Sequence, residues 1–143
     1  MKRKALRFGK GFNVVLGNKH SQAAKMVLEP GKSAGDAQNR HAGAAQWLFV
    51  VSGNGVATVN RRRYTLRPMT LLLMEHSDQH EIRNSGRGLL KTLNFYVPPA
   101  YTAEGNELPT AKPAERETRS RRSPHDALPG NAGHQRRARR PSR

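Results

Sequence analysis

Short apolar runs, separated by glycine, proline and polar residues, dominate the pattern of this chain. No window shows a capped helical period, whereas runs of this length that are rich in Val, Phe, Trp and Leu favour strands. The runs predict strands over residues 12–16, 25–29, 46–52, 55–60, 64–66, 70–74, 81–83 and 89–97. Their spacing of about ten residues, with turn residues between them, is typical of an all-β sandwich or barrel.

Two of these runs are continuous rather than alternating. Residues 46–52 (QWLFVVS) and 70–74 (TLLLM) therefore predict strands that are buried on both faces. The Ser52-Gly53-Asn54-Gly55 turn predicts that the first of them pairs with 55–60 as a hairpin.

The alternation of side chains along residues 46–52 divides this strand into two faces. Gln46, Leu48 and Val50 share one face, which we expect to line the barrel interior. Trp47, Phe49 and Val51 share the other.

Charge is concentrated at the two ends. The 143 residues include 26 Lys and Arg against 10 Asp and Glu, a net charge of +16. Five of the bases lie in the first ten residues, and residues 114–143 contain nine Arg, one Leu and no aromatic, Val, Ile or Met. A segment of that composition lacks the apolar surface that would offset the entropy of ordering it. We therefore expect a basic N-terminal arm over 1–11, a β-barrel domain over 12–101, and a polar exit with a disordered, Arg-rich tail over 102–143.

The chain has no cysteine, which excludes a disulfide framework, a thiolate nucleophile and a zinc site built on thiolates. No apolar run approaches the roughly 20 residues that span a bilayer. The basic start is not followed by the roughly 7–15 apolar residues of a secretory signal. These features predict a cytoplasmic protein.

Histidine and amide side chains gather in two segments that border predicted strands. Asn39 and His41 are two residues apart, so an extended chain projects both to the same side. Gln46 opens a strand after a four-residue bend, and His80 stands at the opening of a later strand. Nitrogen and oxygen donors that converge inside a small barrel suit a divalent transition metal.

The order and spacing of these residues resemble the two motifs of the cupin superfamily. The matching residues are His41, Gln46 and Gly53 in the first motif, and His80 and Asn84 in the second. The resemblance covers about residues 26–101. It implies a small single-domain cupin, folded as a jelly-roll β-barrel and paired as a homodimer.

The resemblance also implies a divalent metal held by three histidines and a glutamate. The corresponding residues here are Asn39, His41, Gln46 and His80, a neutral set in which amides replace the carboxylate and one imidazole. We therefore expect iron, manganese, zinc or nickel to bind weakly or not at all. The residues expected to line the pocket are Leu48, Val50 and His76, the last of them at its mouth.

Three alternatives stay open from the sequence. A histidine beside an amide, such as His80 with Gln46, also suits a hydrogen-bonded core pair. The fold does not distinguish an enzyme from a binding protein, and no residue identifies a substrate or a catalytic group. The basic tail would also allow association with nucleic acid or acidic surfaces, because it would neutralise phosphates without reading bases.

Overall fold

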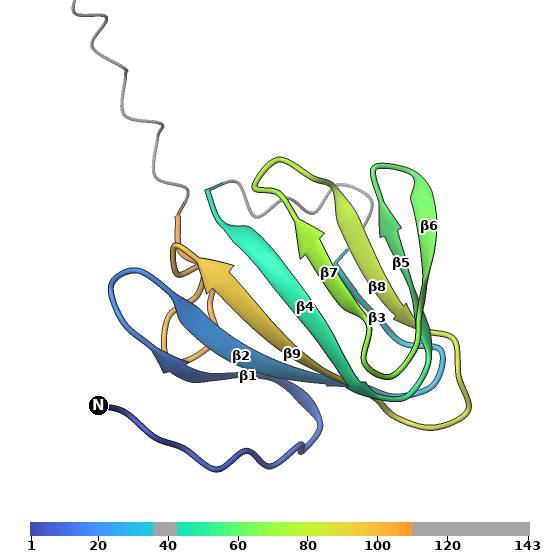
Figure 1. Ribbon diagram of the computed structural model, residues 1–143, viewed down its shortest axis with the longest axis horizontal. Coiled ribbons are helices and arrows are strands. Elements are labelled where there is room, and N and C mark those ends of the chain that lie inside the picture. Colours follow the sequence, from blue (N-terminus) through green and yellow to red (C-terminus); the bar gives the residue numbers. More distant parts are fainter. Residues whose placement is uncertain (36–42, 110–143) are drawn as a thin grey trace, which may run out of the picture.

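A computed structural model describes residues 1–35 and 43–109 of the chain. All regular structure in these residues is β-strand (Figure 1). The strands are β1 (Gly11–Gly17), β2 (Gln22–Leu28), β3 (Ser33–Gly35), β4 (Ala45–Ser52), β5 (Gly55–Val59), β6 (Arg62–Leu66), β7 (Leu71–Met74), β8 (His80–Asn84) and β9 (Leu90–Val97). The tail that the sequence predicts to be disordered falls mostly in 110–143, outside the described residues.

The strands form two antiparallel sheets that face each other. The five-stranded sheet has the order β1-β2-β9-β4-β7, and the four-stranded sheet has the order β3-β8-β5-β6. Neighbours in each sheet come from distant parts of the sequence, as when β4 pairs with both β7 and β9. The predicted all-β jelly roll is confirmed.

The core lies between the two sheets. Leu48 and Val50 of β4 pack there with Ala57 of β5, Ile82 of β8 and Leu90 of β9, all of them almost fully buried. Alternate residues of β4 therefore point inward, as predicted for Gln46, Leu48 and Val50. Truncating one large side chain in such a core to alanine costs about 2–5 kcal/mol.

The continuous apolar runs are not buried on both faces, and that prediction is wrong. Trp47 keeps 40% of its surface exposed, and Leu71 and Leu73 keep 57% and 40%. Their side chains point away from the four-stranded sheet, because residues between them point inward. The runs are continuous in sequence although the core covers only one side of each strand.

The predicted hairpin between 46–52 and 55–60 is also wrong. The strands formed by these residues belong to different sheets, so the turn at Gly53 crosses from one sheet to the other. Gly53 has a φ of +89°, and a Cβ there would lie 2.3 Å from the carbonyl oxygen of Leu89. Glycine is therefore needed here because the turn lies close to the β8–β9 connection. The turn does not join two paired strands.

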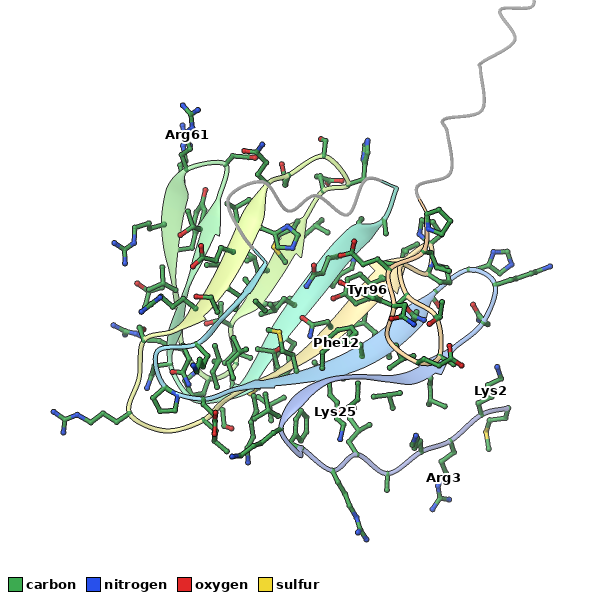
Figure 2. All side chains as sticks on the ribbon, turned by 180° about the vertical axis from the view of Figure 1, so that it is seen from behind. Lys2, Arg3, Phe12, Lys25, Arg61 and Tyr96 are labelled. Atoms are coloured by element: carbon green, nitrogen blue, oxygen red, sulfur yellow. The ribbon has the colours of Figure 1, made fainter. Side chains whose placement is uncertain are left out.

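The tight hairpin lies one connection later, between β5 and β6. Asn60 and Arg61 take positive φ values of 48° and 67°, the two-residue turn that matches the twist of paired strands. Arg61 stands at the tip of this hairpin (Figure 2). The short β3 was not predicted, because its three residues, Ser33–Gly35, contain a single apolar side chain.

The segment after β9 closes one end of the sandwich. The side-chain amide of Gln22 donates to the carbonyl oxygen of Tyr101 at 2.7 Å and accepts from its N–H at 3.1 Å. Tyr101 packs against Phe12 and Tyr96, with ring centroids 4.6 and 5.0 Å away. Residues 98–109 are thereby held against β1 and β2 rather than leading straight away from the barrel.

Candidate functional site

A row of polar side chains lies inside the barrel on the five-stranded sheet. Gln46, Thr92 and Asn94 are at least 96% buried. The side-chain nitrogen of Gln46 donates to the amide oxygen of Asn94 at 3.2 Å, and the nitrogen of Asn94 donates to the Thr92 hydroxyl at 3.1 Å. The row follows from register, because the inward residues of β9 lie beside the inward residues of β4.

The side-chain oxygen of Gln46 takes no part in this row of hydrogen bonds. Both amide nitrogens donate along the row, so the Gln46 oxygen Oε1 is not used in it. Oε1 is buried and has no hydrogen-bond partner among the described residues. A buried carbonyl oxygen without a donor costs about 1–3 kcal/mol, so this atom calls for a donor that the described chain does not supply.

His80 begins β8 and is 96% buried, directly opposite Val59 of β5. Its ring nitrogen Nδ1 lies 3.3 Å from the backbone carbonyl oxygen of Asp78. A carbonyl only accepts, so Nδ1 carries the proton and Nε2 carries the lone pair in the neutral ring. Burial lowers the pKa of His80, which keeps the imidazole neutral at physiological pH.

Gln46 and His80 lie at the same end of the sandwich. Gln46 is the register partner of Met74, the last residue of β7, and a five-residue connection then leads to His80. Both side chains are buried between the sheets. Gln46 on one sheet and His80 on the other are therefore both buried at this end of the barrel interior.

The connection that delivers His80 is held in place by Asp78. One carboxylate oxygen of Asp78 accepts from the Asn60 amide at 2.6 Å, and the other accepts from the backbone N–H of Glu75 at 2.8 Å. The Asn60 oxygen in turn accepts from the backbone N–H of Gln79 at 3.0 Å. The β5–β6 hairpin thus determines where His80 enters its strand.

Tyr96 borders the same end from the other side. It is the cross-strand neighbour of both Gln22 and Gln46, and its hydroxyl is hydrogen-bonded to that of Tyr101. Burial raises the pKa of Tyr101 to about 12 and the pKa of Tyr96 well above its ordinary value. Both phenols are neutral, so they place no charge beside Gln46.

A cleft of about 550 Å³ opens at the edge of the barrel between β6 and β7. Its lining consists of Val59, Asn60, Arg62, Tyr64, Leu72, Leu73 and Asp78. Val59 is the residue opposite His80. Gln46 and His80 do not themselves line this cleft.

Three of the remaining predicted site residues lie in the described part of the chain, and two lie outside it. Asn39 and His41 fall in 36–42, outside the described residues. Leu48 and Val50 are fully buried in the core, and His76 is exposed on the connection between β7 and β8. Sequence reasoning missed Thr92 and Asn94. The available signal was the spacing of Thr92 and Asn94, which stand two positions apart inside the apolar run 89–97.

The second-motif asparagine has a structural part. Asn84 is fully buried, and its amide nitrogen donates to the carbonyl oxygens of Leu28 at 2.7 Å and Gly88 at 2.8 Å. Its oxygen accepts from the N–H of Gly86 at 2.9 Å. Asn84 thus holds the β8–β9 turn against the end of β2, at the opposite end of β8 from His80.

The donors of the described residues do not fit a tightly held divalent metal. Within 1–35 and 43–109 no three His, Asp or Glu side chains lie close enough to hold one ion. Gln46 and His80 offer one amide oxygen and one imidazole, and two neutral ligands alone attract a divalent transition metal weakly. Across the same residues, no helix long and apolar enough to cross a membrane is found.

Comparison with known proteins agrees with the observed fold. The family model described as "Cupin domain" matches residues 24–96, just over half of the chain. No curated protein matches the chain.

Solved structures show the same fold at low identity. A protein of Bacillus halodurans is 21% identical with a TM-score of 0.63, over 71% of this chain and 78% of that one. A predicted oxalate decarboxylase of Thermotoga maritima is 24% identical with a TM-score of 0.56, over 62% and 79%. The Cupin_2 domain of an XRE family transcriptional regulator of Enterobacter cloacae is 18% identical with a TM-score of 0.55, over 62% and 95%.

Proposed function

Because this chain belongs to the cupin domain family, we propose that it binds a small organic molecule inside the barrel, beside Gln46 and His80. The observation that carries the proposal is the buried Gln46 oxygen, which has no donor among the described residues. Buried polar groups are nearly always hydrogen-bonded, and the exceptions mark a partner from outside the chain or a functional role. The ligand class that follows is a molecule with O–H or N–H donors.

The electrostatics of this end support a neutral or cationic ligand. Gln46 presents its oxygen Oε1, and burial keeps His80 neutral. Tyr96 and Tyr101 stay protonated, so no fixed charge lies among them. A hydroxyl or amine donates to the Gln46 oxygen, whereas a bare carboxylate without N–H or O–H groups finds no donor in it.

The test compares what the protein retains during native purification. Gln46→Leu keeps the volume of the side chain and removes the open oxygen, and Thr58→Val is the control on the outer side of the four-stranded sheet. Mass spectrometry of small molecules released by denaturation is expected to find a compound in wild type and in Thr58→Val that is lost in Gln46→Leu. The same compound at the same occupancy in all three proteins would contradict the proposal.

A divalent metal remains a prediction for the four family positions, two of which lie in 36–42. Restoring the family pattern with Asn39→His and Gln46→Glu adds an imidazole and an anionic oxygen. We expect wild type to bind zinc or manganese weakly, and the double variant to bind orders of magnitude more tightly.

Calorimetric titration tests this, with His80→Ala in the double variant as control. Stoichiometric metal in dialysed wild type would contradict the argument from neutral ligands.

A second candidate function, association with nucleic acid or acidic surfaces, rests on the exposed basic arm. Lys2, Arg3 and Lys4 are all exposed, and residues 114–143 add nine Arg. Phosphate neutralisation by such groups makes affinity fall steeply with salt, with a slope of about −0.9 per phosphate on a log–log plot. Replacing the nine Arg by Ser is expected to reduce that slope for a random DNA duplex. An unchanged slope would remove the tail from the interaction.

A further inference from the structure

The β5–β6 hairpin ends the four-stranded sheet and leaves one edge of it unpaired. β6 is the last strand in the order β3-β8-β5-β6, so its outer edge meets no further strand within residues 1–35 and 43–109 (Figure 1). Such an edge presents a row of backbone N–H and C=O groups to which another extended chain can pair. β7 is likewise the last strand of the five-stranded sheet, and residues of both edge strands line the cleft of about 550 Å³.

Two side chains of β6 point into this cleft and not into a closed core. Arg62 is the register partner of Val59, and two residues later Tyr64 stands on the same side of β6. Val59 is buried in the core, and cross-strand partners share one side of a sheet, so both β6 side chains stand on the core side. Both are nevertheless exposed, Tyr64 by 43%, because the opposite sheet ends at β7 and does not cover them.

One carboxylate also borders the cleft, but its two oxygens already accept hydrogen bonds. Asp78 accepts from the Asn60 amide at 2.6 Å and from the backbone N–H of Glu75 at 2.8 Å. No carboxylate of residues 1–35 and 43–109 forms an ion pair with Arg62. The guanidinium of Arg62 is therefore open to an anion from outside the described chain.

Three consecutive arginines make this edge of the sheet basic. Arg61 stands at the hairpin tip (Figure 2), and Arg62 and Arg63 are the first residues of β6. All three are exposed, and successive side chains of a strand point to opposite faces, so an added strand meets positive charge on both of its faces. A basic chain, including a second copy of this one with its net charge of +16, is repelled there, and an acidic chain is attracted.

From these observations we propose that an extended acidic segment of another protein adds as a strand to the edge of β6. In this mode of binding, main-chain hydrogen bonds supply affinity, and pockets for alternate side chains supply specificity. The cleft receives the side chains on one face of the added strand. Neither Gln46 nor His80 lines the cleft, so this interaction is separate from the ligand proposed for the barrel interior.

The side chains along β6 specify the sequence of the added strand. The residue beside Tyr64 enters the part of the cleft that Val59 and Leu72 line, so it is expected to be apolar. The residues beside Arg62 and Arg63 face guanidinium groups, so both are expected to be Asp or Glu. An antiparallel strand, which is the slightly more stable pairing, meets these positions in the order apolar, acidic, acidic.

Nucleic acid fits this edge less well than a peptide does. Its phosphates would neutralise the three arginines, but a phosphodiester backbone has no N–H groups to donate to the carbonyl oxygens of a strand edge. The aliphatic side chains of Val59 and Leu72 in the cleft also offer nothing to a phosphate. The combination of free strand edge, apolar lining and basic end therefore favours an acidic peptide.

The test measures binding of a fluorescein-labelled peptide, Thr-Val-Thr-Phe-Glu-Glu-Thr, to the full-length chain by fluorescence anisotropy. Wild type is expected to bind it, and Arg62→Glu is expected to raise Kd roughly tenfold, because the reversal replaces attraction by repulsion. Arg87→Glu is the matched control, since it makes the same charge change on the exposed β8–β9 connection, away from the β5–β6 hairpin. It is expected to bind the peptide nearly as wild type does.

Two further peptides separate strand addition from simple attraction of charge. Each has the same sequence with every second backbone nitrogen methylated, in one or the other alternation, so both keep the two Glu side chains. One alternation removes the N–H groups that face β6, and we expect that peptide to bind roughly tenfold more weakly than the other. Amide hydrogen exchange in β6 is expected to slow when the unmethylated peptide binds. Circular dichroism confirms that each variant is folded before it is compared.

Four results would overturn the proposal. No binding of the unmethylated peptide to wild type would mean that the arginines only protect the edge from pairing. Equal binding of the two methylated peptides would assign the interaction to charge alone. Equal weakening by Arg62→Glu and Arg87→Glu would place the peptide elsewhere on the basic surface. A random DNA duplex that binds in place of the peptide and is lost in Arg62→Glu would assign this edge to nucleic acid.

Discussion

The five-stranded sheet buries Gln46, Thr92 and Asn94 and exposes Trp47 and Leu73. The four-stranded sheet follows the reverse pattern in β5 and β6, although its β8 also buries His80 and Asn84. Ala57 and Ile82 point into the core, whereas Arg63, Thr65 and Arg83 point to solvent. The second pattern is the one that binary patterning predicts for a two-layer sandwich.

The difference shows which faces depart from the pattern expected of a two-layer sandwich. Buried amides are tolerated because they satisfy each other, yet one oxygen on Gln46 is left over. Exposed tryptophan and leucine add nothing to the core of a single chain. The five-stranded sheet therefore departs from the usual pattern on both faces, and the departure on the inner face is the one on which the proposed ligand rests.

The largest expected effect separates the two kinds of apolar residue. Ile82→Ala leaves a cavity in the core, and we expect it to lower the free energy of unfolding by about 2–4 kcal/mol. Phe95→Ala on the outer side of the five-stranded sheet is expected to cost less than about 1 kcal/mol. Urea denaturation measures both. Equal losses would mean that the outer side of the five-stranded sheet is part of the core.

The next effect concerns the buried polar row. Asn94→Ala removes the acceptor of the Gln46 amide nitrogen and leaves that nitrogen buried, so we expect a loss of about 1–3 kcal/mol. Thr58→Ala, on the outer side of β5, is the matched control and is expected to change the unfolding free energy by less than about 0.5 kcal/mol. A loss no larger than that of the control would show that the row does not contribute to stability.

His80 makes stability depend on pH. Its pKa is lowered in the folded chain because burial disfavours the charged imidazole, so the unfolded chain binds the proton more readily. The stabilisation is complete above the unfolded pKa of about 6.5 and is lost as pH falls through the lower folded pKa. We expect His80→Asn to flatten this part of the unfolding free energy profile. A profile that keeps its slope would assign it to another group.

The smallest effect belongs to the outer side of the four-stranded sheet. Arg63→Gln is expected to change the unfolding free energy by less than about 0.5 kcal/mol, because this side chain is exposed and outside the core. Thermal denaturation measures it, and a domain of about 100 residues shifts its Tm by roughly 4–8 °C per kcal/mol. A larger shift would indicate that Arg63 makes contacts that stabilise the fold.

The sequence by itself determined the class of fold, the approximate strand positions and the inward face of residues 46–52. Short apolar runs and the two-residue period are local properties, so they can be read without knowing what each strand pairs with. Gln46 and His80 were also predicted as site residues from the sequence, because the spacing of the two motifs places them at the openings of predicted strands.

Only the tertiary structure decided the pairing and the covering of each face. The Gly53 turn was predicted to join a hairpin, but the close approach of Leu89 makes it a crossing between sheets. Asn94 lies 48 residues after Gln46 and meets it only through the β4–β9 register. Apolar runs look alike in sequence whether one or two of their faces are buried, because burial depends on whether another layer of the molecule lies above them.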